Sequence, residues 1–360
     1  MRIDSSVMAL SPLLWTPLLS FALAVGAHVL AIRYFPRLGL LDFPERYGHQ
    51  RGRIPYPTGI LLVLLFLAFF LALDRDWNAQ SFSVAAAVVL LALVSFIDDR
   101  RPLHPAFRLG VQLFAALLVF VGGARIYSFS NPLGEQFGVL SLDTWTIDVP
   151  GLGRLPILSG VFTVVWLGLT TNAMNWFDGI PGQVSTLSTL GFLTIGLLSI
   201  SSRVQQPSLA LLAFILAGLS AGALVFDFPP ARVLMGDTGA MFLGFMLGLL
   251  TIYSGGKVAT AFLVLGVPLI DLVIVMVRRV AKRRAIWHGS RGNEHLHHRL
   301  QRKGWSDRSI ILLTALIGTL FGISALFLNT AQKAIAAVIL FTLMLALSRY
   351  SRTPLPSSHA

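Results

Sequence analysis

Long apolar segments alternate with short polar segments along almost the whole chain of 360 residues. Several of them approach or exceed the roughly 20 residues that an α-helix needs to cross a bilayer. The pattern predicts an all-α polytopic membrane protein with about 11 transmembrane helices. These helices are expected near residues 12–32, 58–73, 83–97, 107–121, 157–174, 184–200, 208–226, 238–252, 258–277, 309–328 and 331–348.

The predicted helices form one transmembrane domain over residues 1–348, followed by a cytoplasmic tail at 349–360 that is expected to be disordered. The first apolar segment lacks a strongly basic leader and is too long for a signal peptide, so it is interpreted as the first span. Residues 122–156 contain interspersed Gly and Pro between short strand-like stretches. They predict a small extracytoplasmic hairpin.

Basic residues lie mainly in the loops on one side of the predicted helices. The chain is 55% hydrophobic, and it carries 28 Lys and Arg, for a net charge of +12. Of these 28, 21 fall on one side, including those of a basic loop at 278–308, and 7 fall on the other. The positive-inside rule makes the first side cytoplasmic, with the N-terminus outside and the C-terminus inside. Because the charges lie in short loops, no nucleic-acid partner is expected. The absence of cysteine excludes disulfides and thiolate chemistry.

Polar residues gather in five of the cytoplasmic loops, at 42–59, 98–105, 172–183, 226–240 and 278–308. Asp98 and Asp99 end the third predicted helix, where two adjacent carboxylates oppose the helix dipole. One interpretation is a solvated helix end. The other is a pair that binds a divalent cation or transfers a proton.

The loop at 172–183 reads NAMNWFDGIPGQ. Asn175 and Asp178 are three residues apart and share a face if the helix continues, while Gly179 and Gly182 permit a sharp turn or a close ligand. Helix capping is the alternative interpretation. It explains one such residue more easily than four.

Asp237 lies in the sequence MGDTGA, just before the eighth predicted helix, where an Asp is an ordinary N-cap. Alternatively, Gly236 and Gly239 let backbone amides approach an anion, and Asp237 holds the metal that neutralises it. The loop lacks the Gly-Lys-Ser ending of a Walker loop.

Three histidines and an arginine, His295, His297, His298 and Arg299, lie together in the sequence HLHHRL. Zinc is the rival ligand, but the chain has no Cys, and the spacing departs from the i, i+4 pair of zinc hydrolases. Imidazoles and a guanidinium in a basic loop suit a diphosphate better. Asp271, inside the ninth predicted helix, must pair with a cation or line a polar cavity, because a carboxylate at that depth is costly.

In this order the loops resemble those of the polyprenyl-phosphate N-acetylhexosamine-1-phosphate transferases, over about residues 42–308. This family includes the bacterial phospho-N-acetylmuramoyl-pentapeptide transferase. The HLHHRL form and the eleventh span are more similar to the N-acetylglucosamine-type initiating enzymes. The matching positions are Asp98, Asp99, Gln112, Asn172, Asn175, Asp178, Gly179, Asp237, the histidines of HLHHRL, and Arg46 and His49 in PERYGHQRGR.

The resemblance implies transfer of HexNAc-1-phosphate, with GlcNAc the expected sugar, from a UDP-sugar to polyprenyl phosphate with release of UMP. The product would be the first lipid-linked intermediate of cell-wall or surface-polysaccharide synthesis. The site would lie on the cytoplasmic face of the inner (plasma) membrane. The resemblance also implies Mg²⁺, with Mn²⁺ as a substitute, held by Asp237 with Asn175, and it is compatible with a homodimer.

The resemblance further implies catalytic roles for three carboxylates. Asp98 is expected to be the general base or to orient the prenyl phosphate, and Asp99 to support substrate or metal. A single in-line displacement is preferred to a covalent intermediate on Asp178 or Asp98. The substrate-binding residues are expected to be Arg46, His49, Asn172, Gly179, His295, His297, His298 and Arg299.

Four positions depart from the family pattern: Pro181 replaces the second Asp of the Asp-Gly loop, Tyr47 a Lys, Ala240 a Ser and Gly292 an Asp. Pro181 leaves the choice of nucleotide sugar open. A transporter or flippase of a polyprenyl-linked intermediate is the alternative function, although it would place its polar site near mid-membrane. A non-catalytic lipid-binding scaffold is a third, in which the carboxylates would be dispensable.

Overall fold

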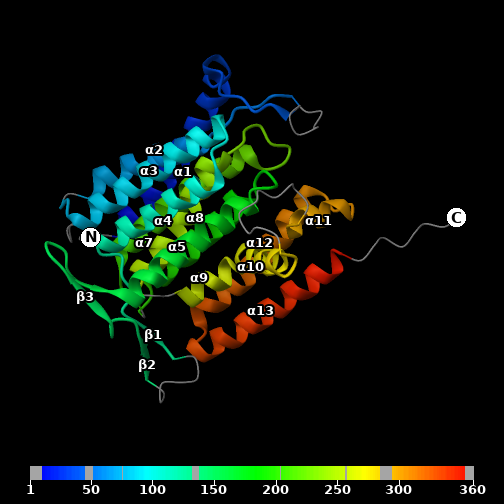
Figure 1. Cartoon of the computed structure of the whole chain (residues 1–360). Helices are drawn as coiled ribbons and strands as arrows, with labels where there is room; N and C mark the ends of the chain where they lie inside the picture. The colour runs from blue at the N-terminus through cyan, green and yellow to red at the C-terminus, as the bar shows by residue number, and fades with distance from the viewer. Residues whose placement is uncertain are drawn as a thin grey trace.

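The computed structural model describes residues 10–44, 52–74, 76–131, 138–202, 204–255, 258–283 and 294–352. Long helices run side by side as one bundle, with two small hairpins at one end (Figure 1). The first helices are α1 (Leu10–Tyr34), the short 3₁₀ helix η2 (Pro36–Leu38), α2 (Gly59–Leu73), α3 (Ala79–Arg100), α4 (Pro105–Val121), α5 (Ile157–Phe177), α6 (Gln183–Ile200) and α7 (Pro207–Asp227). They are followed by α8 (Gly236–Tyr253), α9 (Val258–Val264), α10 (Gly266–Ala281), α11 (Leu296–Arg302), α12 (Asp307–Phe327) and α13 (Thr330–Tyr350).

Every predicted span contains a helix. Among the described residues, eight helices are long and apolar enough to cross a membrane, namely α1, α3, α5, α6, α7, α8, α12 and α13. The helices α2 and α4 are apolar but shorter, and the ninth predicted span is the pair α9 and α10, bent by 85°. The all-α polytopic fold is confirmed, whereas the count of 11 spans stays a prediction.

The bend between α9 and α10 falls at Leu265 and is followed by Gly266 and Pro268. Proline has no N–H with which to continue the hydrogen bonds of α9, and it is well tolerated in the first turn of a new helix. Gly266 also lies against Leu340 of α13, where a Cβ would collide. The break therefore has a local cause in the sequence, and it lets α10 take its own direction through the bundle.

Side-chain caps explain where several helices begin. Asn78 accepts a hydrogen bond from the N–H of Ser81 at the start of α3, and Ser306 does the same for Ser309 at the start of α12. Asn329 forms a reciprocal capping box with Gln332 at the start of α13.

The most deeply buried long helix is α8, whereas α1 and α13 expose many apolar side chains, as lipid-facing helices do. The helix α8 packs against α2, α3 and α5. Gly244 and Gly248 lie against Thr170 of α5, where a Cβ on either glycine would collide. Small residues four apart let two helices approach closely. The contact sets α5 beside α8 and so brings the end of one near the beginning of the other.

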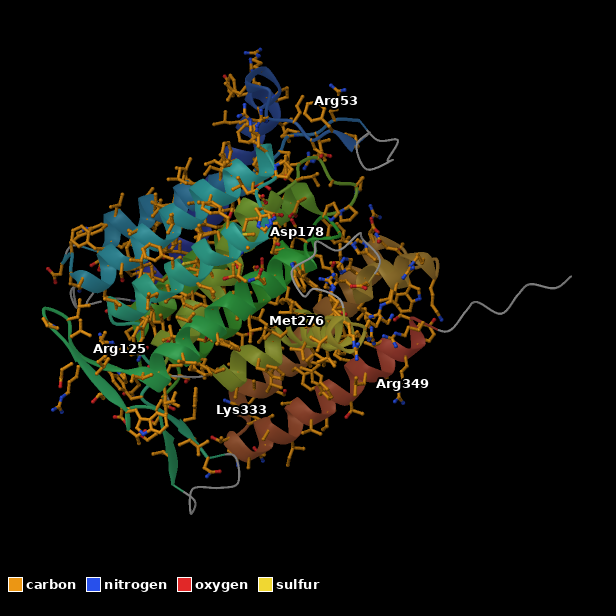
Figure 2. All side chains as sticks on the ribbon, viewed as in Figure 1. Arg53, Arg125, Asp178, Met276, Lys333 and Arg349 are labelled. Carbon is orange, nitrogen blue, oxygen red and sulfur yellow. The ribbon has the colours of Figure 1, made fainter. Side chains whose placement is uncertain are left out.

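The described part of the segment 122–156 contains two antiparallel hairpins, where the sequence predicts a single one. One pairs β1 (Ser128–Ser130) with β2 (Val139–Ser141), and the other pairs β3 (Thr146–Val149) with β4 (Gly153–Pro156). The hairpins lie toward one end of the bundle, together with Arg125 and Lys333, while Arg53 and Arg349 lie toward the other end (Figure 2). Asp178 lies nearer the end that carries Arg53 and Arg349. These four basic residues thus lie at the ends that the charge count assigns to them.

Candidate functional site

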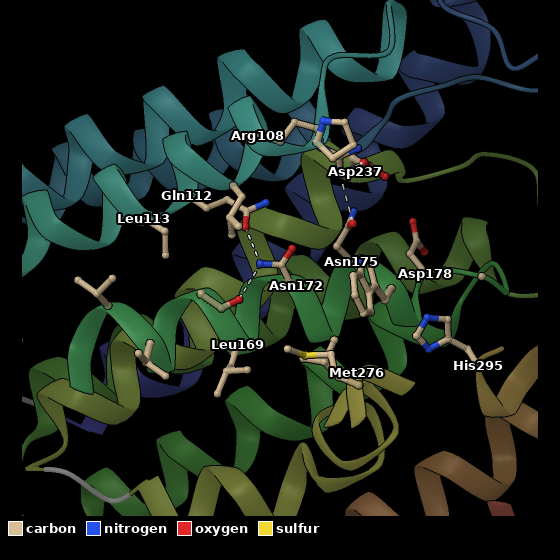
Figure 3. A pocket seen from close by; sticks show the side chains of 18 of the residues that line it. Arg108, Gln112, Leu113, Leu169, Asn172, Asn175, Asp178, Asp237, Met276 and His295 are labelled. Carbon is tan, nitrogen blue, oxygen red and sulfur yellow. Dashed lines mark hydrogen bonds and ion pairs between the residues drawn. The ribbon is translucent and has the colours of Figure 1, made fainter. Parts of the chain in front are cut away.

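A cavity of about 520 Å³ opens between α4, α5 and α10. Its polar end receives Arg108 from α4, Asn175 from α5 and Asp237 from α8, and Figure 3 shows these side chains pointing toward one another. Its walls, farther along the same helices, are apolar. The wall is formed by Leu109, Leu113, Val164, Val165, Leu169, Leu272 and Met276.

The side chain of Asp99 caps the N-terminus of α8. Its carboxylate accepts hydrogen bonds from the N–H groups of Asp237 (2.9 Å) and Thr238 (3.0 Å), and from the hydroxyls of Thr238 (2.5 Å) and Tyr56 (2.6 Å). These N–H groups have no partner within the helix, and an anion stabilises them there. The turn needs Gly236, because its φ is +76° and a Cβ would lie 2.9 Å from the Asp99 carboxylate. Asp99 thus positions Asp237, and its catalytic role stays a prediction.

Arg108 joins residues that the sequence places in three separate loops. One guanidinium nitrogen, Nη1, lies 2.6 Å from a carboxylate oxygen of Asp98, and Nη2 lies 2.6 Å from one of Asp237. Nη2 also donates to the side-chain carbonyl of Asn175 at 3.4 Å. Sequence reasoning missed Arg108 and counted it only as a topological charge. The available signal was its spacing of four residues from Gln112, which puts both on one face of α4.

The oxygen atoms around Arg108 suit a divalent cation. Carboxylate and amide oxygens are the ligands that Mg²⁺ prefers, and those of Asp98, Asp237 and Asn175 already surround one cationic group. The Asn175 amide nitrogen is buried and has no hydrogen-bond partner among the described residues. In that part of the chain no group of three or more His, Cys, Asp or Glu is arranged around a metal position, and the oxygen ligands at hand are two carboxylates and one amide carbonyl. The residues present therefore fit the predicted metal.

Asn172 braces the wall between α4 and α5. Its side-chain nitrogen donates to the Gln112 side-chain carbonyl at 2.6 Å and to the backbone carbonyl of Gly168 at 2.8 Å (Figure 3). Both Asn172 and Gln112 line the cavity. The substrate contact predicted for Asn172 stays a prediction, and its present contacts hold the two helices together.

Asp178 ends α5 and lines the cavity. Burial, and then the negative charges of Asp237, Asp227 and Asp99, raise the pKa of Asp178 well above its ordinary value. The adjacent Gly179 faces the ring of His297, where a Cβ would collide. A glycine at 179 therefore lets the turn after α5 touch α11.

A second turn residue, Gly182, completes the connection to α6. Its φ is +87°, and a Cβ there would lie 3.0 Å from the backbone of Phe228. Pro181, the departure noted in the sequence, comes directly before it in this tight connection. A left-handed φ and a close backbone neighbour together explain the glycine at 182.

Asp271 anchors the histidine cluster from inside α10. One carboxylate oxygen lies 2.8 Å from Nδ1 of His295, and the other accepts from the N–H of Leu296 at 3.1 Å. The Arg299 guanidinium lies 3.6 Å from the same carboxylate. Asp271 and Arg299 are both buried, as is His295, which also lines the cavity. The carboxylate thus has the cationic partner that its depth in the ninth span requires.

The other two histidines pack against each other beside this anchor. His298 lines the cavity, and its ring centroid is 4.1 Å from that of His297. Burial, and then the charges of His298, His295 and Arg299, lower the pKa of His297 well below its ordinary value. Its Nε2 is buried with no hydrogen-bond partner among the described residues. His297 is therefore a neutral imidazole near pH 7 with one unused nitrogen beside Gly179.

Arg299 is turned away from the cavity and toward α13. Its guanidinium donates to the backbone carbonyl and the hydroxyl of Ser348 in α13, at 3.1 and 3.2 Å, and does not line the cavity. It joins α11 to α13, because Asp271 and Ser348 draw it into the bundle. Phosphate binding by Arg299 stays a prediction that this position does not support. Arg46 and His49 lie outside the described residues.

Comparisons with known proteins agree on one group of enzymes. The family model described as "Glycosyl transferase family 4" matches residues 81–255, which run from α3 through α8. The probable undecaprenyl-phosphate N-acetylglucosaminyl 1-phosphate transferase of Bacillus subtilis is 28% identical over 317 residues, covering 86% of this chain and 83% of that protein. The decaprenyl-phosphate N-acetylglucosaminephosphotransferase of Mycobacterium tuberculosis is 29% identical over 378 residues, covering 92% and 88%. The undecaprenyl-phosphate alpha-N-acetylglucosaminyl 1-phosphate transferase of Escherichia coli is 28% identical over 297 residues, covering 79% and 75%.

Proposed function

We propose that this chain is a glycosyl transferase of family 4, whose model matches residues 81–255, and that it transfers N-acetylglucosamine 1-phosphate from UDP-GlcNAc to a polyprenyl phosphate, releasing UMP. The names of its relatives in three bacteria support both the sugar and the polyprenyl acceptor. The charged side chains of Arg108, Asp178 and Asp237 lie at one end of the cavity (Figure 3), which does not favour a transporter.

The cavity is the observation that carries the proposal. An acceptor with a charged head and a long apolar tail needs a site that is polar at one end and apolar along its walls. The cavity between α4, α5 and α10 has this form, with Asp237 and Arg108 at its polar end and Leu113, Leu169 and Met276 along its walls (Figure 3). Phosphate chemistry would occur at the polar end.

The proposed reaction is a single in-line displacement. An oxygen of the prenyl phosphate attacks the phosphorus that bears the sugar, the bond from that phosphorus to the UMP oxygen breaks, and UMP leaves with the electron pair. Because a phosphate monoester is largely dianionic near pH 7, little proton removal is required, and Asp98 would orient the acceptor or take its residual proton. A Mg²⁺ ion held by Asp237 and Asn175 would neutralise phosphate charge when bound. His295 and His298 line the same cavity and would contact the phosphates.

A direct assay tests the proposal. Purified full-length protein is incubated with labelled UDP-GlcNAc, MgCl₂ and undecaprenyl phosphate, and labelled lipid and UMP are measured. We expect equal amounts of both products and no reaction without Mg²⁺. A panel of UDP-sugars in the same assay tests the donor. Failure to release UMP from every UDP-HexNAc would contradict the proposal.

A larger side chain in the wall of the cavity is expected to weaken binding of the acceptor and to leave binding of the donor unchanged. We expect Met276→Trp to raise the KM for undecaprenyl phosphate by about tenfold or more, because steric mismatch in an apolar pocket changes discrimination by roughly 10- to 200-fold. The KM for UDP-GlcNAc should stay within about twofold, since the donor is expected at the polar end. Initial rates against each substrate in turn measure both constants.

Val277→Trp is the matched control for this prediction. Val277 is the next residue of α10 and is 62% exposed, whereas Met276 lines the cavity. The control adds the same indole outside the cavity and should leave both constants unchanged. Equal effects of the two substitutions would show that the cavity does not bind the prenyl chain.

A further inference from the structure

Arg108 occupies the place that a divalent cation would take. We propose that Arg108 is the internal counter-ion of the metal site: its guanidinium holds Asp237 and Asn175 when no metal is bound, and a divalent cation displaces it from Asp237. This inference rests on the proposed function only where it assigns the released guanidinium to the phosphates of the substrate.

The two cations need the same oxygen atoms. Nη2 of Arg108 lies 2.6 Å from Oδ2 of Asp237 and 3.4 Å from the side-chain carbonyl of Asn175. A bound Mg²⁺ approaches its ligand oxygens to about 2.1 Å. A guanidinium and a divalent cation at such distances from one oxygen repel each other strongly. Binding of one is therefore competitive with binding of the other.

The carboxylates are held in place, and the arginine is the part that moves. Asp98 accepts the N–H of Leu103 at 2.7 Å through the oxygen that does not face Arg108. The backbone of Asp237 is held by Asp99. The Arg108 side chain has several rotatable bonds, is 24% exposed and lines the cavity.

After release from Asp237, Arg108 would still pair with Asp98 and could bind phosphate. Its other nitrogen remains paired with Asp98, so the guanidinium stays at the polar end of the cavity. A planar guanidinium binds phosphate oxygens well. Metal loading would thus turn a charge that neutralises carboxylates into one that faces the phosphates of the substrate.

The test measures metal binding without any substrate. Mn²⁺ is titrated into the detergent-purified full-length protein, and the electron paramagnetic resonance signal of free Mn²⁺ gives the Kd. We expect Arg108→Gln to lower the Kd for Mn²⁺ by about tenfold, within the roughly 5- to 150-fold range of couplings between two bound groups. Arg101→Gln is the control, because it removes an exposed arginine from the nearby connection between α3 and α4 and should leave the Kd unchanged.

A second measurement separates competition from general damage. We expect Arg108→Gln to lower the melting temperature of the metal-free protein, because Asp98 and Asp237 then face each other without a cation. Addition of Mn²⁺ should raise the melting temperature of this variant more than that of the wild type. Arg108→Lys, which keeps one positive charge, should give an intermediate Kd and serves if the first variant does not fold. Adding Asp237→Asn should abolish the tight binding in either background.

An unchanged or weaker Mn²⁺ affinity in Arg108→Gln would overturn the inference, as would tight binding that persists in Asp237→Asn. The outcome is independent of the transferase assay. If Mn²⁺ binds more tightly but no UMP is released from any UDP-sugar, the proposed function fails and the counter-ion role stands. If UMP is released but the Kd does not fall, the reverse holds.

Discussion

We expect Asp237→Asn to lower the rate of UMP release by about 10²- to 10³-fold, the usual effect of removing one group that stabilises transition-state charge. The structure places this carboxylate at the polar end of the cavity, where the substitution removes a negative charge that pairs with Arg108 and that a metal needs. The backbone N–H of residue 237 would still bond to Asp99. The loss should therefore appear in activity and in Mn²⁺ affinity, with little change in melting temperature.

Asp148→Asn is the matched control. Asp148 lies on β3, in the hairpins at the other end of the bundle, and its side chain is 76% exposed. The same chemical change there should leave UMP release within about twofold, because surface substitutions away from a site rarely matter. Comparable activity of the two variants would remove Asp237 from the proposed mechanism.

We expect Asp99→Asn to lower both stability and activity. The Asp99 carboxylate serves four donors, and an amide cannot accept from all of them. Leaving a buried donor without an acceptor costs about 1–3 kcal/mol, so the free energy of unfolding should fall by about 2 kcal/mol. Transfer should also slow, because the turn that carries Asp237 is no longer held. Thermal unfolding in detergent and the UMP assay measure the two effects.

Tyr56→Phe separates the positioning role of Asp99 from direct chemistry. It removes one donor to the carboxylate and leaves the charge, and should cost about 0.5–1.5 kcal/mol with most activity retained. If Asp99→Asn instead abolishes transfer at an unchanged melting temperature, Asp99 acts on the substrate and its capping of α8 is incidental.

The arrangement of loops could be predicted because each carries its own local pattern. Asp98 and Asp99 end one apolar segment, Asn175 and Asp178 another, and Asp237 precedes a third. All five lie near the polar end of the cavity. Asn175, Asp178 and Asp237 line the cavity itself. Arg108 escaped notice because an arginine in a cytoplasmic loop already has an explanation in the positive-inside rule.

Apolar length, turn residues and ordered motifs are local properties, so the membrane class, the order of the helices, the hairpin segment and the resemblance to a transferase family could all be read from the sequence. The contacts among the polar residues, in contrast, follow from the packing of the helices. Arg108 pairs with Asp237, 129 residues away, and Arg299 turns to Ser348, 49 residues away. Such partners are chosen by helix packing, as where Gly248 lets α5 approach α8, and contacts between distant segments leave no period in the chain.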